Sequence, residues 1–143
     1  MNIHIGCDHA GFELKEQLKK YLLEKGNSVN DHGCYSLERA DYPDHAHKVA
    51  EAVLSDANSL GILMCGSGNG INISANKHKG IRSALCWTPE IAALARQHND
   101  ANVMALPARF IDVKTASACA DAFLSANFEG GRHADRVKKI EAC

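Results

Sequence analysis

Short strand-like segments alternate with amphipathic helical segments along most of this sequence. The strand-like segments are residues 3–7, 60–65, 81–86 and 102–106. The helical segments, in which apolar residues recur at helical spacing, are residues 12–25, 46–54, 91–97 and 113–124. Strands separated by helices of this length pair in parallel through right-handed crossovers. The alternation therefore predicts an α/β fold: a doubly wound, Rossmann-like parallel sheet sandwiched by helices.

The chain length and the helix-end signals predict a single domain with a detached C-terminal helix. The chain has 143 residues, about the size of one domain, and no repeat or linker-like run divides it. Gly26 predicts the end of the first helix, and Thr88 followed by Pro89 predicts the start of another. We expect one domain over residues 1–143. Its C-terminal basic helix, at about 131–143, is a candidate for docking on a neighbouring subunit.

Composition and charge exclude several classes of protein. The chain is 45% hydrophobic and 23% charged, with a formal net charge of −1. Without a global basic field we expect no nucleic-acid partner, and without a long apolar run we expect no contact with a membrane. The N-terminus does not resemble a signal peptide, which favours a cytoplasmic location. The six cysteines are singly spaced, and we expect them to remain thiols.

Three polar segments are candidates for a ligand site. In a doubly wound sheet, ligands bind beyond the carboxyl ends of the strands, at a switch in strand order. We expect the pair Asp8 and His9, the segment 65–70, and the pair His98 and Asn99 to converge at this edge.

The segment 66–70 is rich in glycine. Its three glycines, at positions 66, 68 and 70, let the backbone approach a ligand closely and turn N–H groups toward an anion. The spacing is neither the dinucleotide pattern G-x-G-x-x-G nor a P-loop, which disfavours nicotinamide and ATP. A tight turn without a ligand is the alternative interpretation.

Cys65 ends a predicted strand where this glycine loop begins. Its sulfur is expected close to the N–H groups of the loop, a setting that favours a thiolate able to act as base or nucleophile. A cysteine at the end of an apolar strand is also common as a small core residue. The position six residues later is Ile71 rather than arginine, which disfavours phosphatase chemistry.

Arg132 and Arg136 are four residues apart, so they share one face of the predicted tail helix. Two guanidinium groups at this spacing can bind one phosphate, and Arg109 is a possible third. A solvated basic face is the alternative. His98 with Asn99 could equally end a helix, and His9 could be a satisfied loop histidine.

Together these segments resemble the ribose-5-phosphate isomerase B family, which also includes the subunits of galactose-6-phosphate isomerase. The resemblance covers essentially the whole chain and rests on six ordered motifs. They are GCDHAG at 6–11, DYPD at 41–44, CGSGNG at 65–70, ANK at 75–77, HNDAN at 98–102 and RHADR at 132–136.

The resemblance implies isomerisation between ribose 5-phosphate and ribulose 5-phosphate through a cis-enediolate, without a metal or cofactor. Cys65 corresponds to the base that moves a proton between C1 and C2, and His98 to the acid that opens the furanose ring. Ser67 retains a catalytic hydroxyl where many members carry threonine. The residues implied to bind substrate are Asp8, His9, Gly66, Ser67, Gly68, Asn69, Gly70, Asn99, Arg109, Arg132 and Arg136. Members are dimers or tetramers whose sites are shared between subunits, and for this chain the resemblance implies a homodimer or homotetramer. These residues therefore need not converge within one chain.

Two alternatives remain open from the sequence. One is isomerisation of a six-carbon sugar phosphate, allose 6-phosphate or galactose 6-phosphate, because the family shares its core chemistry. The other is a non-catalytic phosphate-binding module of the same fold. Such a module gives no reason for Cys65 and His98.

Overall fold

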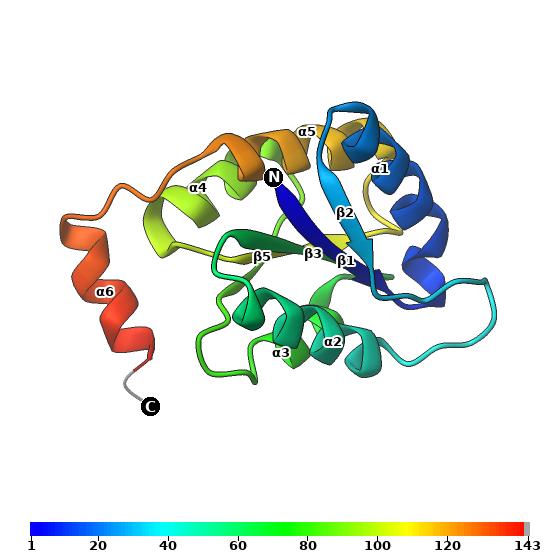
Figure 1. The fold of residues 1–143 in the computed structure, drawn as a ribbon, viewed down its shortest axis with the longest axis horizontal. Coiled ribbons are helices and arrows are strands. Elements are labelled where there is room, and N and C mark those ends of the chain that lie inside the picture. The colour runs from blue at the N-terminus through cyan, green and yellow to red at the C-terminus, as the bar shows by residue number, and fades with distance from the viewer. Residues whose placement is uncertain (142–143) are drawn as a thin grey trace.

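The computed structural model describes residues 1–141 and contains a parallel sheet with helices on both faces (Figure 1). The strands are β1 (Asn2–Cys7), β2 (Ser28–Asp31), β3 (Ser59–Cys65), β4 (Ser83–Leu85) and β5 (Val103–Pro107). The helices are the 3-10 turn η1 (His9–Gly11), α1 (Phe12–Glu24), α2 (Tyr42–Ser55), α3 (Asn69–Ala75), α4 (Pro89–Asn99), α5 (Val113–Ser125) and α6 (Arg132–Ile140). The predicted doubly wound α/β fold is confirmed.

The strand order β2-β1-β3-β5-β4 places a switch point between β1 and β3. From β1 the chain adds β2 on one side, and from β3 it adds β4 and β5 on the other. In this parallel pair Cys7 lies opposite Met64, so both strands end at the same edge of the sheet. This is where a doubly wound sheet binds ligands.

Side chains alternate between the two faces of β3. Leu60, Ile62 and Met64 pack in the core that includes residues of α1, α4 and α5, whereas Leu63 and Cys65 pack in the core that includes residues of α2 and α3. Figure 1 shows these helices on opposite faces of the sheet. Cys65 therefore faces the α2 and α3 layer.

The predicted helix ends are confirmed at two positions. The N–H of Gly26 donates to Leu23 O at 2.9 Å just after α1 ends. Thr88 Oγ1 accepts a hydrogen bond from the N–H of Ile91 at 3.3 Å, and Pro89 begins α4.

Several boundaries differ from the prediction. β2 lacks an apolar run, and its position depends on pairing with β1, where Ile3 lies opposite Val29. β4 is shorter than predicted, α4 extends through Asn99, and α6 ends at Ile140. The last two residues of the predicted tail, 142–143, lie outside the described part.

Five cysteines are free thiols, as predicted: Cys7, Cys34, Cys65, Cys86 and Cys119. Cys143 lies outside the described residues. Within residues 1–141, no helix has the length and apolar character needed to cross a membrane.

Candidate active site

Asp8 and Cys65 lie at the carboxyl ends of the neighbouring strands β1 and β3, on either side of the switch point. Cys65 is the last residue of β3 and its side chain is 4% exposed. Asp8 follows β1, and its N–H donates to Met64 O at 3.2 Å. The Asp8 carboxylate is buried and accepts a hydrogen bond from the N–H of Gly11 at 3.1 Å. This bond fixes a carboxylate beside the end of β3.

The glycine loop depends on the absence of side chains at two of its positions. Gly68 has φ of 76° and precedes α3 as its cap. A Cβ there would collide with Leu85, and a Cβ at Gly70 would lie 2.6 Å from the Tyr42 ring. Larger residues at these two positions would displace the loop, so the glycines allow it to pack closely against Leu85 and Tyr42. Within the loop, the N–H of Asn69 donates to Ser67 Oγ at 3.3 Å.

Arg109 brings a cation to the same loop. Its N–H donates to Gly66 O at 3.0 Å, just after the end of β5. Its guanidinium lies over Gly66, where a Cβ would be 3.4 Å from Nη1. Ser67 and Arg109 are both exposed, so a ligand that approaches the loop meets a hydroxyl and a positive charge.

His9 and Tyr42 border this region. The Nδ1 of His9 lies 3.2 Å from Ala40 O, which matches the interpretation of His9 as a satisfied loop histidine at that nitrogen. Its Nε2 is the nitrogen left to meet a ligand. Tyr42 was not predicted as a site residue, although its motif contributed to the resemblance. Only the folded chain brings its ring against Gly70.

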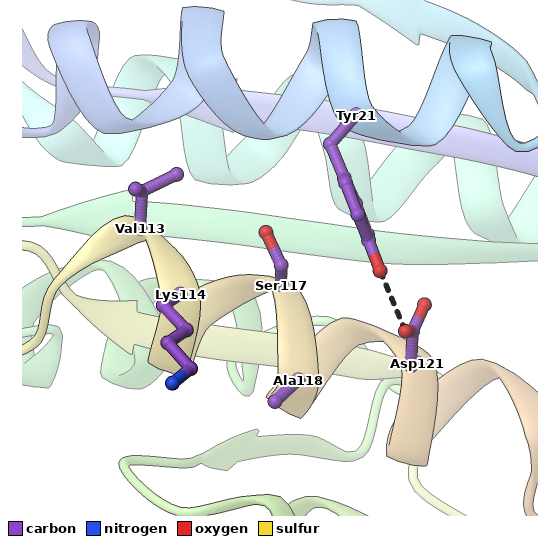
Figure 2. A pocket seen from close by; sticks show the side chains of 6 residues that line it. All are labelled: Tyr21, Val113, Lys114, Ser117, Ala118 and Asp121. Carbon is purple, nitrogen blue, oxygen red and sulfur yellow. Dashed lines mark hydrogen bonds between the residues drawn. The ribbon is translucent and has the colours of Figure 1, made fainter.

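A cavity of about 360 Å³ opens beside the glycine loop. Its lining includes Ser67 and Asn69 together with the exposed aromatic residues Trp87 and Phe110. A second cavity, of about 470 Å³, lies between α1 and α5, where Tyr21 Oη donates to Asp121 at 2.7 Å (Figure 2). None of the predicted site residues lines that second cavity, so we do not assign the reaction to it.

The prediction that His98 and Asn99 converge with these residues at one edge is wrong for a single chain. They are the last residues of α4, and the chain continues directly into the start of β5. The N–H of Gly61, near the start of β3, donates to Asn102 O at 2.9 Å. His98 and Asn99 thus lie at the edge where the strands begin, because they precede a strand rather than follow one.

The alternative interpretation of these two residues as a helix end is confirmed, because His98 lies in the last turn of α4 and Asn99 is its last residue, but neither is the cap. Asp100, with φ of 46°, is the cap residue, and its N–H donates to Arg96 O at 3.1 Å. The His98 ring is stacked on the ring of His133 in α6, with the ring centroids 4.2 Å apart and an angle of 7° between the ring planes. Burial, with smaller effects of His98 and Arg132, lowers the pKa of His133, while Glu129 opposes the shift.

Arg132 and Arg136 lie on α6, which packs near α4 (Figure 1). Both side chains are exposed, and within residues 1–141 neither forms an ion pair. The predicted site residues thus form two groups. The carboxyl-edge group is Asp8, His9, Cys65, Gly66, Ser67, Gly68, Asn69, Gly70 and Arg109. The amino-edge group is His98, Asn99, Arg132 and Arg136.

The two groups have complementary chemistry. The carboxyl-edge group offers a cysteine whose thiolate form can accept a proton, with a loop of donors beside it. The amino-edge group offers an imidazole and two guanidinium groups that can hold a phosphate. Neither group holds the whole set needed for an aldose–ketose isomerisation.

Comparison with known proteins identifies the family. Residues 3–140 match the model of the family described as Ribose/Galactose Isomerase. The chain is 49% identical to ribose-5-phosphate isomerase B of Escherichia coli over 98% of its own length and 94% of that protein.

Solved structures agree with this match. The crystal structure of a ribose 5-phosphate isomerase from Thermotoga maritima has a TM-score of 0.97 and 52% identity, covering 99% of this chain and 98% of that one. The ribose-5-phosphate isomerase B of Mycoplasma genitalium, with bound ribulose-5-phosphate, has a TM-score of 0.94 and 45% identity, covering 99% and 94%. This chain is therefore an enzyme of the ribose/galactose isomerase family.

Proposed function

We propose that this chain interconverts ribose 5-phosphate and ribulose 5-phosphate, with Cys65 as the base that moves a proton between C1 and C2. The observation that carries the proposal is the position of Cys65. It ends the central strand β3 at the switch point, beside Asp8 and directly before the glycine loop. The bound ribulose-5-phosphate in the Mycoplasma genitalium relative supports this substrate class.

The glycine loop can stabilise the negative charge that develops on the substrate oxygens during proton transfer. Removing a proton beside a carbonyl builds negative charge on oxygen, and aimed donors stabilise such charge by roughly 3–4 kcal/mol each. The N–H groups of residues 66, 67, 68 and 70 and the Ser67 hydroxyl are the proposed donors. Ser67 Oγ accepts from the N–H of Asn69, which orients the hydroxyl while leaving its hydrogen to donate.

The amino-edge group supplies the remaining functions in this proposal. His98 is the acid that opens the furanose ring, and Arg132 and Arg136 hold the phosphate, with Asn99 as a further sugar contact. Phosphate binding away from the reacting carbons lets binding energy orient C1 and C2. No metal or cofactor takes part in these steps.

Self-association follows from the separation of the two groups. The edges of one sheet cannot both reach one sugar phosphate, so we propose that the carboxyl-edge group of one copy meets the amino-edge group of a second copy in a homodimer or homotetramer. The exposed aromatic residues Trp87 and Phe110, 51% and 75% exposed, lie beside the glycine loop and suit a buried interface.

Proton exchange measured with Cys65→Ser tests the proposal directly. The wild type should catalyse exchange of the substrate C2 proton with solvent, and the variant should lose it by about two to four orders of magnitude. Phosphate binding and folding should be retained, since serine is close to cysteine in size. Exchange at the wild-type rate in Cys65→Ser would refute the assignment of Cys65 as the base. A separate activity screen of six-carbon sugar phosphates would identify any other preferred substrate.

A further inference from the structure

Three potential metal ligands converge where α4, α6 and the segment between α5 and α6 meet. Glu129 Oε2 lies 3.8 Å from His98 Nε2 and 3.7 Å from His133 Nε2. One ligand atom from each of the three side chains lies within 4.8 Å of the other two. The imidazole rings of His98 and His133 are stacked and nearly parallel.

These separations suit an ion better than a direct hydrogen bond. They exceed the roughly 3.2 Å limit of a good N–H···O bond. Two ligands of a tetrahedral zinc ion lie about 3.3 Å apart, given bond lengths near 2.0–2.2 Å. Coordination of one ion by all three atoms would shorten the two Glu129 separations by about half an ångström and would turn the stacked His98 and His133 rings toward the shared ion.

The backbone fixes two of the three positions. The N–H of Glu129 donates to Gln97 O at 3.0 Å, which holds the segment before α6 against the end of α4. The N–H of His133 donates to Gly130 O at 3.0 Å, and its side chain is buried. The convergence is thus set by main-chain contacts as well as by side-chain rotamers.

The other histidine pairs of the chain differ from this cluster. His4 Nδ1 and His32 Nε2 are 2.9 Å apart, and His47 Nδ1 and His78 Nε2 are 2.7 Å apart, so each pair already makes a direct hydrogen bond. Throughout residues 1–141, no other set of three His, Cys, Asp or Glu ligand atoms comes equally close.

We propose that His98, Glu129 and His133 form a binding site for a divalent transition-metal ion, and that the bound ion inhibits the enzyme. Two imidazole nitrogens and one carboxylate oxygen are ligands that Zn²⁺, Co²⁺ and Cu²⁺ accept, whereas Mg²⁺ and Ca²⁺ prefer oxygen alone. A fourth coordination position remains for water.

The bound ion should inhibit the enzyme because His98 would be both a metal ligand and the acid that opens the furanose ring. An ion on Nε2 occupies the lone pair of that nitrogen and ties the ring to Glu129 and His133. The imidazole then cannot take up a proton there or turn toward a sugar. This second half of the inference rests on the proposed function of His98 in ring opening, whereas metal binding itself does not.

Binding is tested by titrating the chelator-treated full chain with Co²⁺ and following its visible absorption and the heat of binding. We expect one site per chain, with affinity at least about tenfold weaker in Glu129→Gln and in His133→Asn. His78→Asn is the matched control and should bind as the wild type does. Equal affinity in the wild type and Glu129→Gln, or loss of binding in His78→Asn, would overturn the site.

Inhibition is tested with Zn²⁺ and two readouts. Conversion of ribose 5-phosphate should fall as the site fills, and Glu129→Gln should need at least tenfold more Zn²⁺ for the same loss. Exchange of the ribulose 5-phosphate C1 proton, which depends on Cys65, should persist. Parallel loss of exchange would mean that the ion acts at Cys65 and would overturn this half. Metal-free protein that binds Co²⁺ as expected but converts no pentose phosphate would refute the proposed function and leave the metal site standing.

Discussion

His98 is the residue whose role can be separated most clearly from proton transfer. Ribose 5-phosphate closes into a furanose, whereas ribulose 5-phosphate cannot, because its C5 hydroxyl carries the phosphate. We expect His98→Asn to slow conversion of ribose 5-phosphate by about two to four orders of magnitude. Exchange of the ribulose 5-phosphate C1 proton with solvent should continue, because the ketose enters already open.

Turnover and exchange are measured on the same His98→Asn preparation, the first by product formation and the second by proton NMR in deuterated buffer. Equal loss of both rates would place His98 in the proton-transfer step or in the integrity of the site, and not in ring opening.

Arg132 and Arg136 should act on binding alone. Each Arg→Ala change removes a charge-assisted hydrogen bond to phosphate, worth about 1.5–3 kcal/mol, so substrate affinity should fall by about one to two orders of magnitude. Inorganic phosphate should compete less well in both variants. Lys138→Ala, on the same helix and also exposed, is the control and should leave competition unchanged. Undiminished competition in the two arginine variants would favour a solvated basic face.

At the level of residues, what the sequence could predict depended on how local the relevant contacts are. Cys65 and its glycine loop are contiguous in sequence, so a strand followed by alternate glycines indicated their arrangement. Tyr42 meets Gly70 only after α2 and α3 pack together, and no spacing in the sequence shows that contact. Lys15 was likewise missed, since a lysine is rarely buried without a partner from another segment.

Lys15 links two elements that border the site. It lies on α1 with its side chain fully buried, and its Nζ is 2.7 and 2.6 Å from the two carboxylate oxygens of Asp31 at the end of β2. Burial opposes ionisation of Asp31, yet the hydrogen bonds from Lys15 and Lys19 outweigh it and hold the pKa of this carboxyl below its usual value. The pair therefore anchors an edge strand that has little apolar surface of its own.

This pair predicts a pH dependence of stability. Because the Asp31 pKa is lower in the folded state than its unfolded value of about 3.9, the ionised pair stabilises the fold fully above that value. The stabilisation is lost as the pH falls through the folded pKa. Asp31→Asn should lower the free energy of unfolding near neutral pH by about 1.5–3 kcal/mol, because it removes the charge-assisted hydrogen bonds to Asp31 and leaves buried Lys15 with Glu16, 3.0 Å away, as its remaining carboxylate partner. Its stability should also fall less steeply than that of the wild type below about pH 4.

Urea unfolding at a series of pH values measures both effects. Glu24→Gln, which removes an exposed pair with Lys20 at 3.9 Å, is the control and should change stability by less than about 1 kcal/mol. A neutral-pH loss in Asp31→Asn no larger than in this control would contradict the anchoring role.

The elements themselves were predictable where the sequence signal was strong. α1 and α5 combine apolar periodicity with clear end signals, and their observed bounds lie within a few residues of those predicted. β2 reads Ser-Val-Asn-Asp, and only Val29 is apolar, so neither alternation nor hydrophobicity marks it. Its conformation is determined by pairing with β1 and by the ion pair of Asp31, which are long-range contacts.

For the molecule as a whole, the separation of the two groups of site residues is the main consequence of the topology. Cys65 ends β3, whereas His98 precedes β5, so a parallel sheet places them at opposite edges. The motifs of the sequence identify both groups, but which edge each occupies depends on whether it precedes or follows its strand. The proposed reaction therefore needs a second copy of the chain to complete each site.

Complementation between two inactive variants tests this requirement most directly. Cys65→Ser and His98→Asn are purified separately, mixed in equal amounts under conditions that exchange subunits, and assayed for conversion of ribose 5-phosphate. If each site takes Cys65 from one copy and His98 from the other, every hybrid dimer contains one intact site, and random mixing should restore about a quarter of the wild-type activity. Activity of the mixture equal to the mean of the two separate variants, with hybrid formation verified by mass spectrometry, would contradict a site built from two copies.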